Sequence, residues 1–203
     1  MKVLVACEES QEICKAFRSR GHEAYSCDLQ DCSGGYPEWH IKDDAQKIIK
    51  QKWDLIIAHP PCTYLSNAGA RWLYPGKQLN EERYKKGLIA KDFFMKFYNA
   101  DCAKIAIENP IPSKIFNLPK CSQIIQPYEF GEEWSKRTCL WLKGLPPLFA
   151  TEIVYNYRPY CTSGSYSRYH DEKYKGASRV GGSAKSRSKT FPGIAKAMAI
   201  QWG

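Results

Sequence analysis

The order of short apolar runs along the chain constrains its fold more than any other feature of the sequence. The runs KVLVA (2–6), WDLIIA (53–58) and AKIAIEN (103–109) are mainly apolar, and segments with a helical spacing of apolar residues separate them. Short apolar runs of this kind are typical of strands that are buried on both faces. Strands that alternate with helices form a sheet with helices packed on its two faces. The sequence therefore predicts an α/β fold with a doubly wound, Rossmann-like sheet.

The other expected elements complete this alternation. A helix is expected from the end of the first strand to about Arg20, and a strongly amphipathic helix is expected over residues 80–100. The remaining predictions are strands at 23–29, 122–128 and 137–144, an extended piece at 40–41, a helix at 43–52 and a closing helix at 192–202.

The charge of the chain indicates the kind of partner it binds. Its 203 residues are enough for one substantial domain, and 30 Lys and Arg against 21 Asp and Glu give a net charge of +9. Such a basic balance favours a polyanionic partner, most simply nucleic acid. No apolar run approaches the roughly 20 residues that a membrane span needs. The N-terminal MKVLVACEES turns acidic too early for a signal peptide.

The nine cysteines are scattered along the chain, and none of them form a C-x-x-C pair. That pattern is typical of reduced thiols in a cytosol rather than of a disulfide framework or a zinc site. We therefore expect a soluble, cytoplasmic protein without a metal.

Residues 151–190 differ from the rest of the sequence in composition. They are rich in Tyr, Ser and Gly, have no clear periodicity, and carry eight Lys and Arg against three Asp and Glu. Two interpretations remain open and are compatible with each other. One is a solvated insertion; the other is a nucleic-acid arm whose cations neutralise phosphates and whose tyrosines stack on bases.

Polar side chains follow four of the expected strands. They are Cys7 to Ser10, Asp28, His59 to Cys62, and Glu108 with Asn109. Ligands of open α/β sheets bind outside the carboxyl ends of the strands, so these residues are expected on one edge. Asp28 suits the ribose hydroxyls of a nucleoside-type cofactor, or is a cap or turn residue.

Cys62 directly follows two prolines, which fix the backbone around the thiol. A cysteine on a stiff loop beside the carboxylate of Glu108 provides a nucleophile and a proton-handling group. Such a pair can attack an electron-poor heteroaromatic ring while the acid neutralises the charge that develops on a ring nitrogen.

Four segments together resemble a known family: HPPCTYLS, IENP, FGEEWSKRTCLWLKG and SKTFPGIAKAMA. In this order they are similar to a shortened cytosine-5 DNA methyltransferase, and they closely resemble small methyltransferase-like proteins of bacteriophages. The resemblance implies a class I methyltransferase sheet in which Cys62 attacks C6 of cytosine and Glu108 contacts N3 and the exocyclic amine. It further implies that Asn109 braces the nucleophile loop and that Arg137 is the basic residue beside the nucleophile.

The resemblance also implies a cofactor and a substrate. The methyl donor would be S-adenosylmethionine, with Asp28 at its ribose and Asp44 at its adenine. The full set expected at the cofactor is Cys7, Glu8, Glu9, Ser10, Asp28, Leu29, Asp44, His59 and Pro60. The set expected at nucleic acid is Ser66, Arg71, Arg168, Lys173, Lys175 and Arg187.

The chain departs from the family pattern in three places. The segment ACEESQE has no glycine where the family has a glycine-rich turn, and the family's arginine pair is reduced to Lys136–Arg137. A catalytic domain is expected over 1–150 and 190–203, and the short basic insertion 151–189 replaces a target-recognition domain.

The expected function is methylation of cytosine C5 in duplex or single-stranded DNA, in the cytoplasm of a bacterial or phage-infected cell. Two alternatives stay open. The same chemistry could act on RNA or a nucleotide, or the scaffold could bind nucleic acid without turnover.

Overall fold

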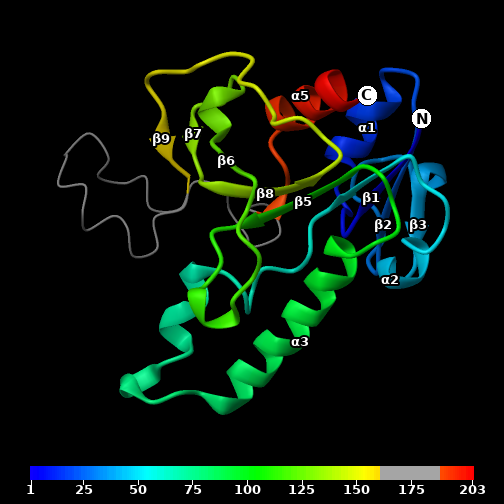
Figure 1. Ribbon diagram of the computed structural model, residues 1–203. Helices are drawn as coiled ribbons and strands as arrows, with labels where there is room; N and C mark the ends of the chain where they lie inside the picture. Colours follow the sequence, from blue (N-terminus) through cyan, green and yellow to red (C-terminus); the bar gives the residue numbers. More distant parts are fainter. Residues whose placement is uncertain (161–187) are drawn as a thin grey trace.

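A seven-stranded sheet organises the protein, for which a computed structural model describes residues 1–160 and 188–203 (Figure 1). The strand order is β3-β2-β1-β4-β5-β8-β6. The strands are β1 Lys2–Ala6, β2 Glu23–Asp28, β3 His40–Lys42, β4 Leu55–Ala58, β5 Ile105–Pro110, β6 Gln123–Ile125 and β8 Thr138–Lys143. β1 to β5 are parallel, whereas β8 is antiparallel to both of its neighbours, β5 and β6. The predicted α/β class with a doubly wound sheet is therefore confirmed.

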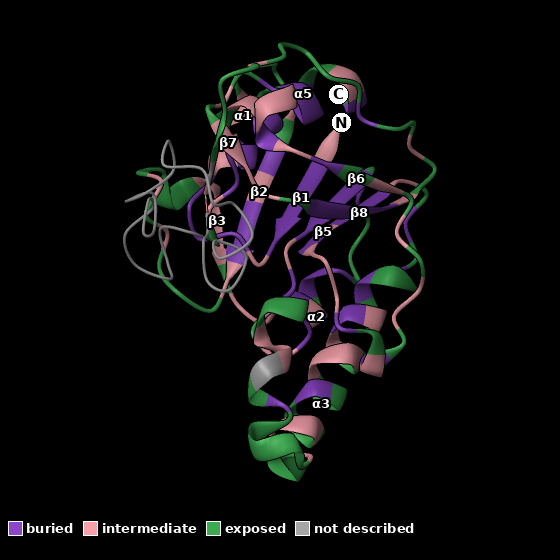
Figure 2. Ribbon diagram, turned by 90° about the vertical axis from the view of Figure 1, so that its left-hand side faces the viewer, coloured by how far each residue is buried: buried purple, intermediate pink, exposed green. Residues whose placement is uncertain are grey.

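Helices cover both faces of this sheet (Figure 1). α1 (Glu12–Arg18) and α5 (Pro192–Trp202) pack together over one face, and α2 (Ala45–Ile48) and α3 (Glu81–Tyr98) lie on the other. Alternate residues of β1 supply the two cores, because successive side chains of a strand point to opposite faces. Val3 and Val5 join the core beneath α1 and α5, and Leu4 and Ala6 join the core beneath α2 and α3. Figure 2 shows this buried centre in purple.

The two halves of α3 have different surroundings. Phe94 and Phe97, in its second half, are fully buried on the sheet. Its first half extends away from the sheet, and Leu88 and Ile89 are exposed there (Figure 2). The projecting part is held by Gly87, where an added Cβ would lie 2.1 Å from the Phe116 ring, so the helix and the residue 116 loop are in direct contact.

Short elements connect the sheet to the rest of the chain. They are the 3-10 turns η1 Pro37–Trp39, η2 Asn67–Trp72, η3 Pro75–Lys77, η4 Lys114–Phe116 and η5 Pro127–Glu129, and the two-stranded ribbon of β7 Trp134–Ser135 and β9 Arg158–Pro159. β9 falls within the expected insertion, and the backbone of Thr151 and Glu152 also bonds to Glu129. The first ten residues of that segment therefore pack against residues 128–135. Of the residues expected at nucleic acid, Arg168, Lys173, Lys175 and Arg187 lie outside the described residues.

Among the described residues, no helix is both long and apolar enough to cross a membrane.

Candidate active site

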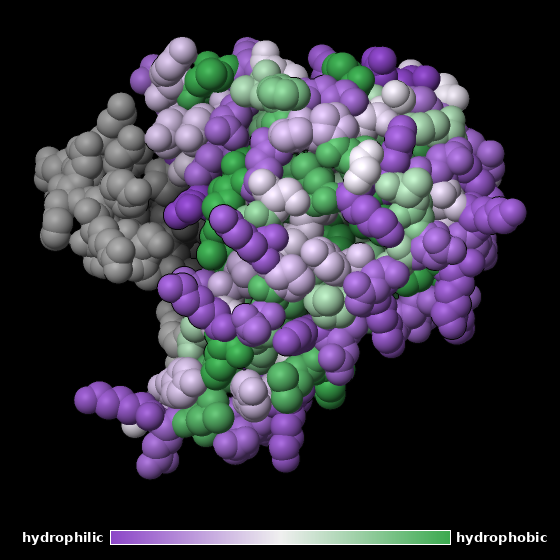
Figure 3. Space-filling model, in the orientation of Figure 1, coloured by the Kyte–Doolittle hydropathy of each residue, from purple (hydrophilic) through white to green (hydrophobic). Residues whose placement is uncertain are grey.

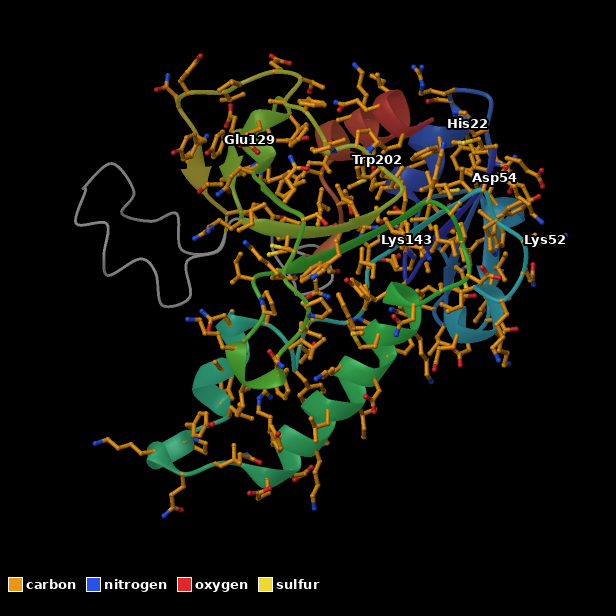
Figure 4. The ribbon with its side chains drawn as sticks, in the orientation of Figure 1. His22, Lys52, Asp54, Glu129, Lys143 and Trp202 are labelled. Carbon is orange, nitrogen blue, oxygen red and sulfur yellow. The ribbon has the colours of Figure 1, made fainter. Side chains whose placement is uncertain are left out.

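The carboxyl ends of β1, β2, β4 and β5 meet at one edge of the sheet, as their parallel pairing requires. The structure thereby brings together most of the residues predicted from the sequence. Figure 4 labels three residues at the opposite edge of the sheet. Lys52 and Asp54 precede β4, and Lys143 ends the antiparallel β8. The candidate site therefore lies on the side of the sheet away from these labelled side chains.

A buried pair of titratable groups occupies the centre of this edge. Nδ1 of His59, just beyond β4, lies 2.9 Å from Oε2 of Glu108 on β5, and each side chain is 14% exposed. The hydroxyl of Thr190 donates to the same carboxylate oxygen at 3.3 Å. Because Oε2 receives both hydrogen bonds, the other oxygen of Glu108 can accept from a ligand. His59 is predicted at the cofactor, and its side chain contacts Glu108.

The two groups perturb each other's protonation. Burial acts to lower the pKa of His59, but the hydrogen bond and charge of Glu108, with a contribution from Glu8, raise it above its ordinary value. Burial acts to raise the pKa of Glu108, yet the hydrogen bond and charge of His59 hold it below its ordinary value. Each group therefore favours the charged form of the other, and the hydrogen bond between Nδ1 and Oε2 holds one proton.

Two further polar atoms at this edge have no partner. Nε2 of His59 and Oδ1 of Asn109 are buried, and neither makes a hydrogen bond within the part of the chain that the structure describes. Buried polar atoms are nearly always hydrogen-bonded in folded proteins, so each of these two atoms indicates a place where a polar ligand can bind.

The loop that carries Cys62 is fixed from two sides. Nδ2 of Asn109 donates to the carbonyl of Pro60 at 2.9 Å, which is the bracing contact expected of that residue. Beyond the cysteine, the backbone of Leu65 and Ser66 bonds back to the Cys62 carbonyl. Ser66 was expected at nucleic acid, but it is only 8% exposed and forms a bridge with Pro112, so it belongs to the frame of the loop.

The charge of Lys136 acts on the Cys62 thiol. Burial raises the pKa of the Cys62 thiol, and the nearby charge of Lys136 acts against this rise. The same lysine also lowers the pKa of Glu108. Arg137 is exposed, because successive residues of an extended segment face opposite ways. The charge that acts on Cys62 thus comes from the residue before the expected Arg137.

The turn between β1 and α1 reaches left-handed backbone conformations without glycine. Cys7 has φ 59° and Gln11 has φ 60°, values that cost free energy for residues with a Cβ. Gln11 offsets this cost by holding residues 33–36 against the turn, through hydrogen bonds of 2.8 and 3.1 Å to the backbone of Tyr36. The contact is so close that a Cβ on Gly34 would lie 2.5 Å from the carbonyl of Ser10.

The polar residues of this turn, which are predicted at the cofactor, are buried. Glu8, Glu9 and Ser10 are 4%, 9% and 5% exposed. The Glu8 carboxylate accepts hydrogen bonds from the backbone N–H groups of Ile13 and Cys14, at 2.7 and 3.3 Å, so it caps α1. Burial raises its pKa to about 7, although the His59 charge and the two backbone donors oppose the rise.

The residues that fit the nucleoside part of S-adenosylmethionine lie at the ends of β1, β2 and β3. Burial and then the charge of Asp28, with smaller effects of Cys27 and Asp44, raise the pKa of Cys7, so the two carboxylates face this thiol. Leu29 beside Asp28 is 72% exposed, an open apolar surface for a purine. Asp44 has a second role as the cap of α2, since it accepts from the backbone of Gln46 at 2.9 Å. Carboxylates suit ribose hydroxyls and a cationic ligand, and the donor set therefore fits this cofactor.

Comparison with known proteins finds distant structural neighbours. No family model and no curated protein matches the sequence. Among solved structures, an E. coli protein described as a "putative DNA modification methyltransferase encoded within prophage" superimposes with a TM-score of 0.46 and 11% identity. The match covers 75% of this chain and 51% of the other, so this chain spans about half the length of that protein.

Proposed function

We propose that this protein is a methyltransferase that transfers a methyl group to C5 of cytosine in DNA. The observation that carries the proposal is the convergence of Cys62 with the Glu108–His59 pair at the carboxyl edge. Lys136 acts electrostatically on both Cys62 and Glu108, so the thiol and the carboxylate belong to one site.

The residues divide the chemistry as follows. C5 of cytosine is a poor nucleophile until another group adds to C6, and the thiolate of Cys62 forms that bond. The ring nitrogen N3 gains electron density in this step, and the proton shared by Glu108 and His59 neutralises it. S-adenosylmethionine, when bound by Asp28, Leu29 and Asp44, supplies the methyl group. The C5 proton then passes to water, the electrons of that bond form the C5–C6 double bond, and Cys62 leaves C6 as a thiolate. The proton on N3 returns to the Glu108–His59 pair, so 5-methylcytosine is released as the neutral base.

Because the pKa of Cys62 is raised, the thiol must lose its proton during the reaction. In the structure the thiol is protonated at neutral pH, because burial outweighs the Lys136 charge. In this scheme Cys62 therefore passes its proton to water as it attacks C6, because the thiolate and not the thiol is the nucleophile.

The test is nucleoside mass spectrometry after incubation with S-adenosylmethionine and, separately, duplex DNA, single-stranded DNA and RNA. We expect 5-methylcytosine with wild type and none with Cys62→Ala. Cys121→Ala is the matched control, because Cys121 is half-buried like Cys62 but precedes β6, the outermost strand of the sheet, which β8 separates from β5. A methylated base from Cys62→Ala, or a base other than 5-methylcytosine, would overturn the role of the thiol. A signal with RNA alone would transfer the chemistry to that polymer.

A second function, nucleic-acid binding without turnover, is favoured by one observation. The β1–α1 turn is buried beneath residues 33–36, which leaves less open space at the end of β1 than a cofactor turn normally has. Thermal unfolding separates the two functions. S-adenosylmethionine at 100 times its Kd stabilises a binding protein by about 2.7 kcal/mol, and no shift at millimolar cofactor would favour the binding function.

A further inference from the structure

The segment from residue 63 to residue 91, here called the lobe, projects from the sheet beside the nucleophile loop (Figures 1 and 2). It contains η2, η3 and the first half of α3. Its sequence contains six Lys and Arg residues but only two glutamates, so the lobe is strongly basic. Figure 3 shows long hydrophilic side chains next to hydrophobic ones on the visible side of the lobe.

The side chain of Arg83 packs α3 of the lobe against the nucleophile loop. The guanidinium of Arg83 on α3 donates to the carbonyl of Thr63 at 2.9 Å and lies 5.0 Å from the centre of the Tyr64 ring. Thr63 is the residue after Cys62. A Cβ on Gly69 would lie 2.9 Å from the same guanidinium, so the small residue leaves room for this contact. A ligand held on the lobe is therefore placed beside the cysteine.

An open cavity of about 430 Å³ lies on this surface. Two aromatic residues, Tyr64 and Trp72, and two cations, Arg83 and Lys86, line it, together with Glu82, which pairs with Lys86 at 2.5 Å. Trp72 is 57% exposed and the neighbouring Tyr74 is 46% exposed. Exposed aromatic rings among cations are the combination with which proteins hold unpaired bases and the phosphates that join them.

We propose that this cavity holds an unpaired base of the nucleic-acid strand that flanks the target cytosine, with Trp72 as its stacking surface and Lys86 at its phosphate. The inference rests on the proposed function only for the identity of the ligand. It assigns strand binding to a part of the chain distinct from the basic segment 151–189.

The experiment measures binding of a fluorescent single-stranded oligonucleotide by anisotropy over a series of salt concentrations. Trp72→Ala should weaken binding about tenfold with an unchanged salt dependence, because one stacked base is lost and no charge. Lys86→Ala should lower the slope of log K against log salt by about 0.7, because one phosphate contact is lost. Lys52→Ala is the matched control; this exposed lysine lies at the opposite edge of the sheet (Figure 4) and should change neither quantity.

Both lobe positions are exposed, so the variants are expected to fold, and thermal unfolding verifies it. Wild-type affinity and salt slope in both lobe variants would overturn the proposal, as would a loss equalled by Lys52→Ala. The assay needs neither cofactor nor turnover. If the lobe binds the strand but no base is methylated, the proposed function fails and this inference stands. If cytosine is methylated but binding ignores both substitutions, only this inference fails.

Discussion

The buried carboxylate of Glu8 should make the stability of the protein fall as pH rises. Its pKa is raised from the ordinary value of 4.5 to about 7, chiefly by burial. A carboxyl that holds its proton more tightly when folded contributes stability that is fully present below its unfolded pKa and is lost as pH rises through its folded pKa. Each pKa unit is worth about 1.4 kcal/mol, so the loss between pH 4 and pH 8 is about 3 kcal/mol.

Glu8→Gln isolates this contribution, because glutamine keeps the shape and one acceptor for the backbone of Ile13 but does not titrate. Any hydrogen bond that the amide forms less well is a constant offset at all pH values. Urea unfolding of both proteins between pH 4 and pH 8 gives the difference in unfolding free energy. We expect wild type to lose about 3 kcal/mol relative to Glu8→Gln across this range, with most of the change between pH 4.5 and pH 7.

Parallel stability curves would refute the reasoning, since they would mean that Glu8 has the same pKa in the folded and unfolded states. A difference that grows in the opposite direction would mean that the carboxylate is stabilised by the α1 backbone more than it is penalised by burial. The result bears on the site, because the charge of Glu8 also acts on His59.

Two further predictions concern contacts described above. In Glu108→Gln the His59 imidazole should titrate at lower pH than in wild type, because its charged partner is gone; NMR of the four histidines of the chain measures this, and an unchanged titration would remove the pair from the mechanism. Gly87→Ala should destabilise the protein by about 1–3 kcal/mol despite the better helix propensity of alanine, because the added Cβ lies 2.1 Å from the Phe116 ring. Leu88→Ala, at an exposed neighbouring position, should cost much less in the same thermal unfolding assay.

The strands near the site can be located from apolar runs in the sequence. Apolar runs locate β1, β4 and β5, and parallel pairing then places Glu108 and the His59 loop at one edge. The reversed direction of β8 does not follow, because an apolar run has the same composition in either direction. The projection of α3 does not follow either, because the helical period of apolar residues fixes a face and not its partner.

Single-residue assignments in the site were harder to predict for two physical reasons. Lys136 and Arg137 are neighbours, and the choice between them depends on which way an extended segment faces, which one register step reverses. The β1–α1 turn has no glycine to mark it, since Cys7 and Gln11 accept the left-handed conformation themselves. A histidine before two prolines, opposite an expected carboxylate on the next strand, was the available signal for the His59–Glu108 pair.

The hydrogen bond between Thr190 and Glu108 forms late, because Thr190 is synthesised after the other residues of the site. Its hydroxyl reaches Glu108 from a position just before α5, and α5 packs against α1 at the start of the chain. Cys62, His59 and Glu108 leave the ribosome long before this last helix. A nascent chain that has not yet reached Thr190 therefore carries Cys62 and Glu108 without this hydrogen bond to the carboxylate.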